Sequence, residues 1–213
     1  MPKTSSKKLK GLSAKTKMSL YEEVYNIVVA IFVISLILSY NFYDPLKTFI
    51  SMPRAFLAVL ITFSLSLISQ KLVARKLRCK AFYRLWLPGL VVSMLIMVVG
   101  VKPVILIGTA TLSTYKFGRW GFKSTHGTMT ELGWIGLSGP LANIVLAYIL
   151  KLFTPFSYLA YVNAVFAFFN LMPVEPLDGA KLVVWNPVLW FLLMIILVLI
   201  LTPSNILSYL SII

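Results

Sequence analysis

One acidic, proline-interrupted stretch holds the residues best suited to chemistry in this chain of 213 residues. It runs from Asn170 to Gly179, contains Pro173 and Pro176, and ends on Asp178-Gly179 after an apolar segment. A carboxylate in apolar surroundings is costly unless it is paired, hydrated or bound to a metal. Asp178 is therefore a candidate metal ligand or buried polar contact. The simpler alternative is that it only caps the helix that follows.

The sequence has few residues that could bind a catalytic metal, because it contains one histidine, His126, and one cysteine, Cys79. A catalytic zinc usually takes three protein ligands and a water, mostly from His, Cys, Asp and Glu. A helix of the His-Glu-x-x-His type, which needs two histidines, is therefore impossible in any register. An unrelated site built from His126 with Glu131, Glu175 or Cys79 stays open. Otherwise we expect Cys79 to be a packed thiol.

The composition indicates a membrane protein. The chain is 59% hydrophobic and 12% charged, and its mean hydropathy is +0.90, so it is too apolar for a soluble globule. The net charge of +14 does not indicate nucleic-acid binding, because the basic residues flank the apolar segments and do not cluster with aromatic side chains. We therefore expect the lipid bilayer of the cell membrane as its environment, and no nucleic-acid partner.

The apolar segments predict an α-helical polytopic membrane protein with five to six transmembrane helices. Four runs can cross about 30 Å of hydrocarbon, and a shorter one ends at the proline turn. A further stretch, broken by glycines and a proline, predicts either a tight pair of short spans or a re-entrant hairpin. A short β element or hairpin is expected between the second span and the Gly-Pro-Leu-Ala-Asn segment. The segments are Tyr21–Tyr40, Ala55–Ala74, Trp134–Phe153 and Pro187–Leu207 for the long runs, Tyr158–Leu171 for the shorter one, Leu85–Tyr115 for the broken stretch, and Gly108–Gly133 for the β element.

The basic residues predict the topology. Residues 1–20 indicate a basic cytoplasmic tail held near anionic lipid headgroups, without the apolar core of a signal peptide, and residues 21–213 indicate one membrane domain. With the N-terminus in the cytoplasm, 16 of the 20 Lys and Arg residues lie on the cytoplasmic side, as the positive-inside rule requires. This topology puts the Asp178 turn and the inner end of the second span on the same side of the membrane.

Two motifs resemble those of the site-2 protease family of intramembrane zinc metallopeptidases. The pattern Asn-x-x-Pro-x-x-Pro-Leu-Asp-Gly from Asn170 to Gly179 is similar to the family's second signature. The segment from Gly139 to Asn143 resembles the Gly-x-x-x-Asn element of its middle core helix. Residues 77–86 and 185–186 look like archaeal members. The resemblance covers about residues 55–190 and implies helices around a zinc ion, which a His-Glu-x-x-His helix and an aspartate would hold.

The family's zinc-binding helix is degenerate in this sequence. An alignment on the Leu-Val-Ala-Arg stretch that ends at Arg75 puts Ser66, Leu67 and Gln70 at the His, Glu and His positions. Ser and Gln are weak neutral donors, and leucine cannot act as a general base. We therefore expect no catalytic residue and no cofactor, and Asp178 would be the one family ligand left if a metal were bound. Instead, Ser66 or Gln70 should hydrogen-bond to Asp178.

These observations favour a catalytically inactive site-2-protease-like membrane protein. Its retained scaffold would bind a transmembrane or extended segment of another membrane protein, for example by strand addition. Two alternatives remain open. One is an active zinc metalloprotease with a non-standard metal site or a site shared with a partner chain. The other is a small transporter or channel, which needs a continuous polar path; its candidates are Gln70, Asn143, Asn163, Asn170 and Asp178.

Overall fold

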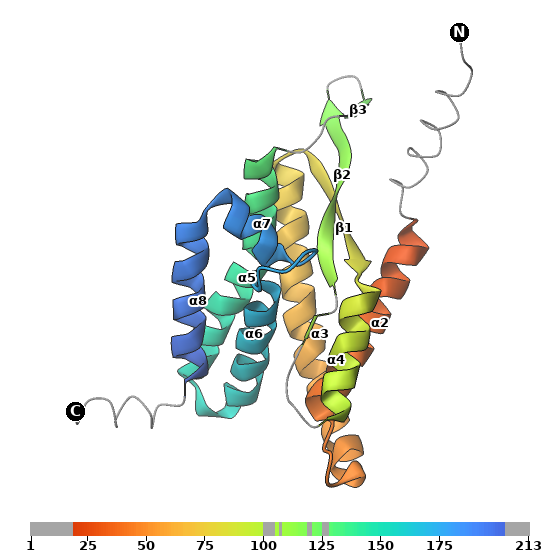
Figure 1. The fold of residues 1–213 in the computed structure, drawn as a ribbon, viewed down its shortest axis with the longest axis vertical. Coiled ribbons are helices and arrows are strands. Elements are labelled where there is room, and N and C mark those ends of the chain that lie inside the picture. The colour runs from red at the N-terminus through yellow and green to blue at the C-terminus, as the bar shows by residue number, and fades with distance from the viewer. Residues whose placement is uncertain (1–18, 100–104, 107, 119–120, 125–127, 203–213) are drawn as a thin grey trace, which may run out of the picture.

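The computed structural model describes residues 19–99, 105–106, 108–118, 121–124 and 128–202. These residues form a bundle of helices with a small antiparallel sheet along one side (Figure 1). The elements in chain order are α2 Leu20–Ser39, α3 Pro45–Lys76, β1 Cys79–Leu85, α4 Leu87–Val98, β2 Gly108–Gly118, β3 Gly121–Ser124, α5 Met129–Lys151, the short 3-10 helix η1 Thr154–Phe156, α6 Ser157–Asn170, α7 Asp178–Trp185 and α8 Pro187–Leu201.

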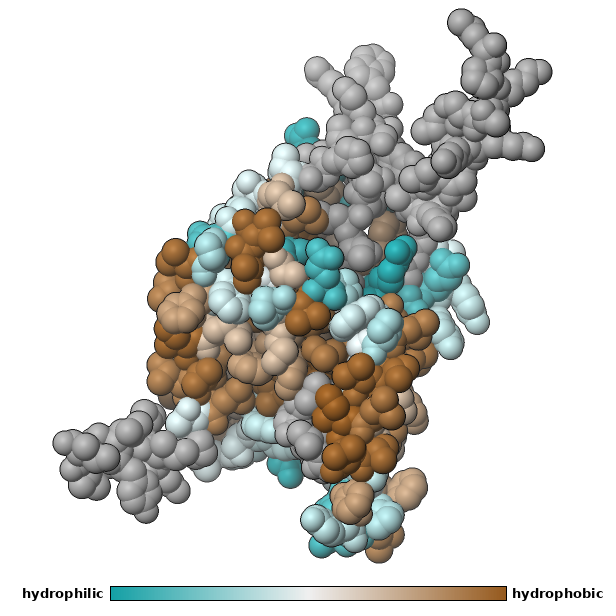
Figure 2. Space-filling view, viewed as in Figure 1, coloured by the Kyte–Doolittle hydropathy of each residue, from teal (hydrophilic) through white to brown (hydrophobic). Residues whose placement is uncertain are grey.

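Among the described residues, α2, α3 and α5 are long and apolar enough to cross a membrane. Helices α4 and α8 are apolar but shorter. The prediction of a helical membrane protein therefore agrees with the structure, and the number of spans stays a prediction. Brown, apolar side chains cover the outer surfaces of α4 and α8 in Figure 2, as expected for helices that face lipid. The predicted tail over residues 1–18 and the predicted end of the last span at Leu207 lie outside the described residues.

Helix α3 begins earlier than the sequence predicts. The predicted start at Ala55 is wrong, because the helix begins at Pro45 and continues through Pro53. The N-cap Asp44 explains the early start: its side chain accepts hydrogen bonds from the backbone nitrogens of Leu46 and Lys47 at 3.1 and 3.2 Å. A proline in the first turn also suits a helix start. Most of the segment between the first two predicted spans therefore forms the first turns of α3.

The broken stretch is one short helix followed by a strand. Helix α4 has 12 residues, or about 18 Å, which is less than the about 30 Å of hydrocarbon. The described part is therefore not a pair of helical spans, and the re-entrant alternative stays a prediction. Strands β2 and β3 confirm the predicted β element, although its last residues begin α5. Strand β1 was not predicted; it pairs antiparallel with β2, and the sheet order is β1-β2-β3.

A buried carboxylate joins three of these elements. Glu23, in the first turn of α2, is 4% exposed. Its Oε1 accepts a hydrogen bond from the backbone nitrogen of Tyr83 in β1 at 3.1 Å and lies 2.8 Å from Nζ of Lys71 in α3. Because a buried carboxylate must be compensated, this contact fixes the edge of β1 against both helices.

Replacing Glu23 with leucine is expected to lower the free energy of unfolding by about 2 kcal/mol, because the buried Tyr83 nitrogen loses its acceptor. Thermal or denaturant unfolding in detergent measures the loss. The control is Glu22→Leu, which removes only the exposed hydrogen bond from the Ser19 nitrogen to Glu22 Oε2 and should cost at most about 1 kcal/mol. Equal losses in both variants would contradict the role of Glu23.

Candidate functional site

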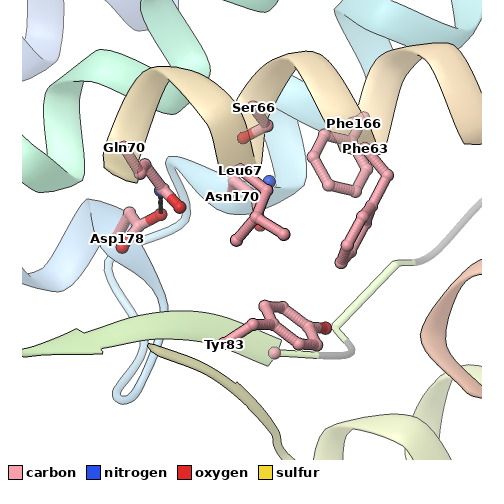
Figure 3. A pocket seen from close by; sticks show the side chains of 9 residues that line it. Phe63, Ser66, Leu67, Gln70, Tyr83, Phe166, Asn170 and Asp178 are labelled. Atoms are coloured by element: carbon pink, nitrogen blue, oxygen red, sulfur yellow. Dashed lines mark hydrogen bonds between the residues drawn. The ribbon is translucent and has the colours of Figure 1, made fainter. Parts of the chain in front are cut away.

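A small pocket lies where α3, the sheet, α6 and α7 meet (Figure 3). Its volume is about 10 Å³, which is room for about one water molecule. It contains the three degenerate positions together with two residues of the proline-interrupted motif. The lining residues are Phe63, Ser66, Leu67, Gln70, Tyr83, Gly108, Phe166, Asn170 and Asp178.

Both carboxylate oxygens of Asp178 are engaged by donors of this chain. Gln70 Nε2 donates to Oδ2 at 2.6 Å, and Lys181 Nζ donates to Oδ1 at 2.8 Å. The Asp178 side chain is 2% exposed and that of Lys181 is 22% exposed. The predicted amide-to-carboxylate bond is thus confirmed for Gln70, and Ser66 lies in the same pocket. An ammonium group and an amide compensate the buried charge.

Close backbone packing sets the position of Asp178. A Cβ on Gly179 would overlap the carbonyl groups of Leu171 and Met172 at the end of α6, so only glycine lets α7 begin this close to α6. The same Leu171 carbonyl accepts a hydrogen bond from Trp190 Nε1 at 2.7 Å. The chain therefore turns back sharply after α6 and brings Asp178 towards α3.

The two prolines of the motif shape this turn and do not line the pocket. Pro173 is exposed and Pro176 is half-buried, and both lie between α6 and α7. A helix cannot easily continue through a proline, so α6 ends at Asn170. The motif residues thus divide into those that reach the pocket, Asn170 and Asp178, and those that shape the backbone.

The Gly-Pro-Leu-Ala-Asn segment lies in α5, behind the pocket. A Cβ on Gly139 would lie 2.5 Å from Ser66 Oγ and 2.8 Å from Gln70 Nε2, so the glycine lets α5 pack closely on α3. Asn143 is one helical turn further along α5, is fully buried, and has no hydrogen-bond partner for either amide atom within the described structure. It is not among the residues that line the pocket.

The aromatic wall of the pocket was missed by the sequence interpretation. Tyr83 of β1 packs edge-on against Phe63, with ring centroids 4.9 Å apart, and Phe63 contacts Phe166 at 5.9 Å. Burial, and secondarily the negative charge of Asp178, raises the pKa of the Tyr83 phenol above its ordinary value. The phenol therefore stays protonated, and this side of the pocket is apolar and uncharged.

The unrelated metal site considered from sequence is not assembled by the described residues. Glu131 forms a capping box with Thr128 at the start of α5, Glu175 is exposed in the turn, and Cys79 is buried in a small apolar cluster on β1. His126 lies outside the described residues. Within the described ranges, no three His, Cys, Asp or Glu side chains come together to hold a metal.

A comparison with known proteins connects the chain to a metalloprotease. The chain is 29% identical over 179 residues to a protein of Methanocaldococcus jannaschii that is described as a "putative zinc metalloprotease". The match covers 79% of this chain and 86% of that protein. No family model and no solved structure matches this chain.

The pocket residues do not fit the zinc ion that this similarity implies. The Gln70 amide presents a nitrogen donor to Asp178, not a ligand atom, and the Lys181 ammonium repels a cation at the other carboxylate oxygen. Ser66 offers one weak neutral oxygen, and Leu67 cannot accept a proton from a zinc-bound water. Asp178 is thus held as half of a buried ion pair.

Proposed function

We propose that this chain is a catalytically inactive site-2-protease-like membrane protein that binds a transmembrane or extended segment of another membrane protein. The observation that supports this most strongly is that both carboxylate oxygens of Asp178 already accept hydrogen bonds, one from Gln70 and one from Lys181. The similarity to a protein described as a metalloprotease supports a common origin with such proteins. The degenerate positions Ser66, Leu67 and Gln70 support the loss of zinc binding and of proteolysis.

The pocket itself is too small for a peptide, so a partner would bind beside it. The sheet offers the simplest mode, because an extended segment can add to an edge strand through backbone hydrogen bonds. The β1 edge is covered: the Tyr83 nitrogen already donates to Glu23 of α2. Strand β3 is at the other edge of the sheet and extends beyond the helices in Figure 1. We therefore assign strand addition to β3.

The metal content tests the catalytic half of the proposal. The purified wild-type chain is expected to hold far less than one zinc per chain by elemental analysis. The combined variant Ser66→His, Leu67→Glu, Gln70→His and Lys181→Ala restores the donor set and removes the competing ammonium, so it should approach one zinc per chain. Its zinc should fall again when Asp178→Ala is added.

The same restored variant with Lys181 retained is the matched control, and it should bind zinc more weakly because the ammonium stays beside Asp178. Stoichiometric zinc in the wild-type chain, together with chelator-sensitive cleavage of a transmembrane substrate, would instead support an active metalloprotease with a non-standard or shared metal site. Flux of ions or small solutes into liposomes would support a transporter or channel.

Photo-crosslinking tests the binding half. A photoreactive amino acid is placed in β3 at Phe122, and in a second variant at Leu192 of α8, and the labelled chain is expressed in the membranes of its own cells. Protein adducts are expected from position 122 and not from position 192. Protein adducts of equal yield from both positions, or none from position 122, would contradict strand addition at β3.

A further inference from the structure

A second apolar feature lies on a different face of α3 from the pocket. A groove of about 670 Å³ runs between α3 and α5. Its walls are formed by side chains from Leu65 to Lys76 of α3 and from Ser138 to Ile149 of α5. Both helices are long and apolar enough to cross a membrane, so the groove opens towards lipid.

The hydroxyl groups of the two serines in the groove already donate hydrogen bonds within their own helices. Ser69 Oγ donates to the Leu65 carbonyl and Ser138 Oγ donates to the Ile135 carbonyl, both at 2.8 Å. The two serines therefore offer their neighbours little more than a small, low-polarity surface. An occupant that binds through hydrogen bonds would find few partners in this groove. A hydrocarbon chain has no polar groups, so it leaves none without a partner when it binds here.

One end of the groove carries positive charge. Lys76 lines it in the last turn of α3, is exposed, and is followed closely by the exposed Arg78. From Leu65 to Lys76 the α3 wall spans twelve residues, a rise of about 16 Å, which is about half of the roughly 30 Å hydrocarbon thickness. With Lys76 at a membrane interface, the groove would reach to about the middle of the bilayer.

We propose that this groove binds a phospholipid, with an acyl chain along α3 and α5 and an anionic headgroup on Lys76. The apolar lining selects the chain, and the lysine at the interface selects the charge. A second copy of this chain is the competing occupant, because Ser138 and Ala142 are small residues four positions apart. A symmetric contact through this groove would bring two like-charged lysines together, however, which disfavours it. The proposal is independent of the proposed function, because no pocket residue takes part.

Native mass spectrometry of the full, delipidated chain in detergent tests this site with three probes. Long-chain phosphatidylglycerol is expected to remain bound at one molecule per chain. Phosphatidylcholine with the same chains should bind more weakly, because its headgroup has no net charge to match Lys76. Short-chain phosphatidylglycerol keeps the headgroup but cannot fill the groove, so it should not be retained. Equal retention of all three lipids would overturn the proposal.

Two variants and one control variant locate the site. Lys76→Gln should weaken phosphatidylglycerol binding about fivefold, the effect of one basic residue at a charged interface, whereas Arg84→Gln removes the same charge outside the groove and should leave it unchanged. Ala142→Phe should fill the groove and weaken binding of both long-chain lipids. Equal losses of phosphatidylglycerol binding in Lys76→Gln and Arg84→Gln would mean that the lipid is attracted by the overall positive charge and not by this groove. A dimer that Ala142→Phe dissociates would identify a second copy as the occupant. Either result overturns the proposal.

Discussion

Replacing Lys181 with methionine is expected to lower the free energy of unfolding by about 3 kcal/mol, the cost of removing one partner from a buried ion pair. The reason is that Asp178 is 2% exposed and would lose the ammonium group that balances its carboxylate, whereas the Gln70 amide supplies a donor without a charge. Methionine preserves the length and apolar stem of lysine, so the packing loss is small. Denaturant unfolding in detergent micelles measures the change.

The matched control is Lys47→Met in the pair Asp44–Lys47, which has the same spacing along a helix start. Those side chains are 37% and 70% exposed and 3.4 Å apart, so the expected loss is below about 1 kcal/mol. Adding Asp178→Asn to Lys181→Met should restore part of the stability, because the uncompensated charge is gone. A double variant less stable than Lys181→Met alone would show that the ammonium does not serve to balance the carboxylate.

Replacing Gly179 with alanine is expected to cost about 3 kcal/mol or more, because a Cβ there overlaps backbone atoms of Leu171 and Met172. Backbone cannot move aside as a side chain can, so α7 must shift away from α6 and carry Asp178 with it. We expect the loss of stability to be accompanied by faster amide hydrogen exchange in α7, because the Gln70–Asp178 contact no longer holds that helix as firmly. Unfolding measurements test the first expectation, and hydrogen exchange of peptides from α7 tests the second.

Gly136 provides the control for this substitution. It faces the same residue, Asp178, from α5, but a Cβ there would lie 3.4 Å from the Asp178 carbonyl oxygen and 3.7 Å from its Cβ, which is ordinary contact. Gly136→Ala should therefore be neutral or stabilise the helix by up to about 1 kcal/mol. If Gly179→Ala were as well tolerated as Gly136→Ala, the close approach of α7 to α6 would not be what positions the carboxylate.

The contact between Gln70 and Asp178 was predictable from sequence, whereas the role of Lys181 was missed. The first followed from motif spacing and from the cost of a lone carboxylate in an apolar segment. Lys181 was used only to assign topology, although a lysine three residues after an aspartate on a helix is close enough to pair with it. Whether such a pair is buried depends on how α7 docks against its neighbours, and sequence alone does not show this.

Strand β1 illustrates the same limit in the fold. Its basic residues Lys80 and Arg84 suggest a solvent-facing loop, yet Ala81 and Tyr83 alternate with them and are buried. Alternation over a few residues predicts a strand only when a partner exists, and that partner, β2, is more than twenty residues away in the sequence. The early start of α3 was missed because apolar runs mark where a span can cross the hydrocarbon and do not mark where the helix begins, and α3 continues through Pro53 to Pro45.

Lys181 also changes what the protein needs from the cell. A protein built around a bound metal obtains its central positive charge from outside, so its folding is linked to metal supply. Here the ammonium that balances Asp178 is synthesised with the chain and is in place once α7 docks. If the chain is the inactive protein proposed above, it should accumulate to the same level in zinc-starved and zinc-replete cells, and its maturation should need no metal-delivery step.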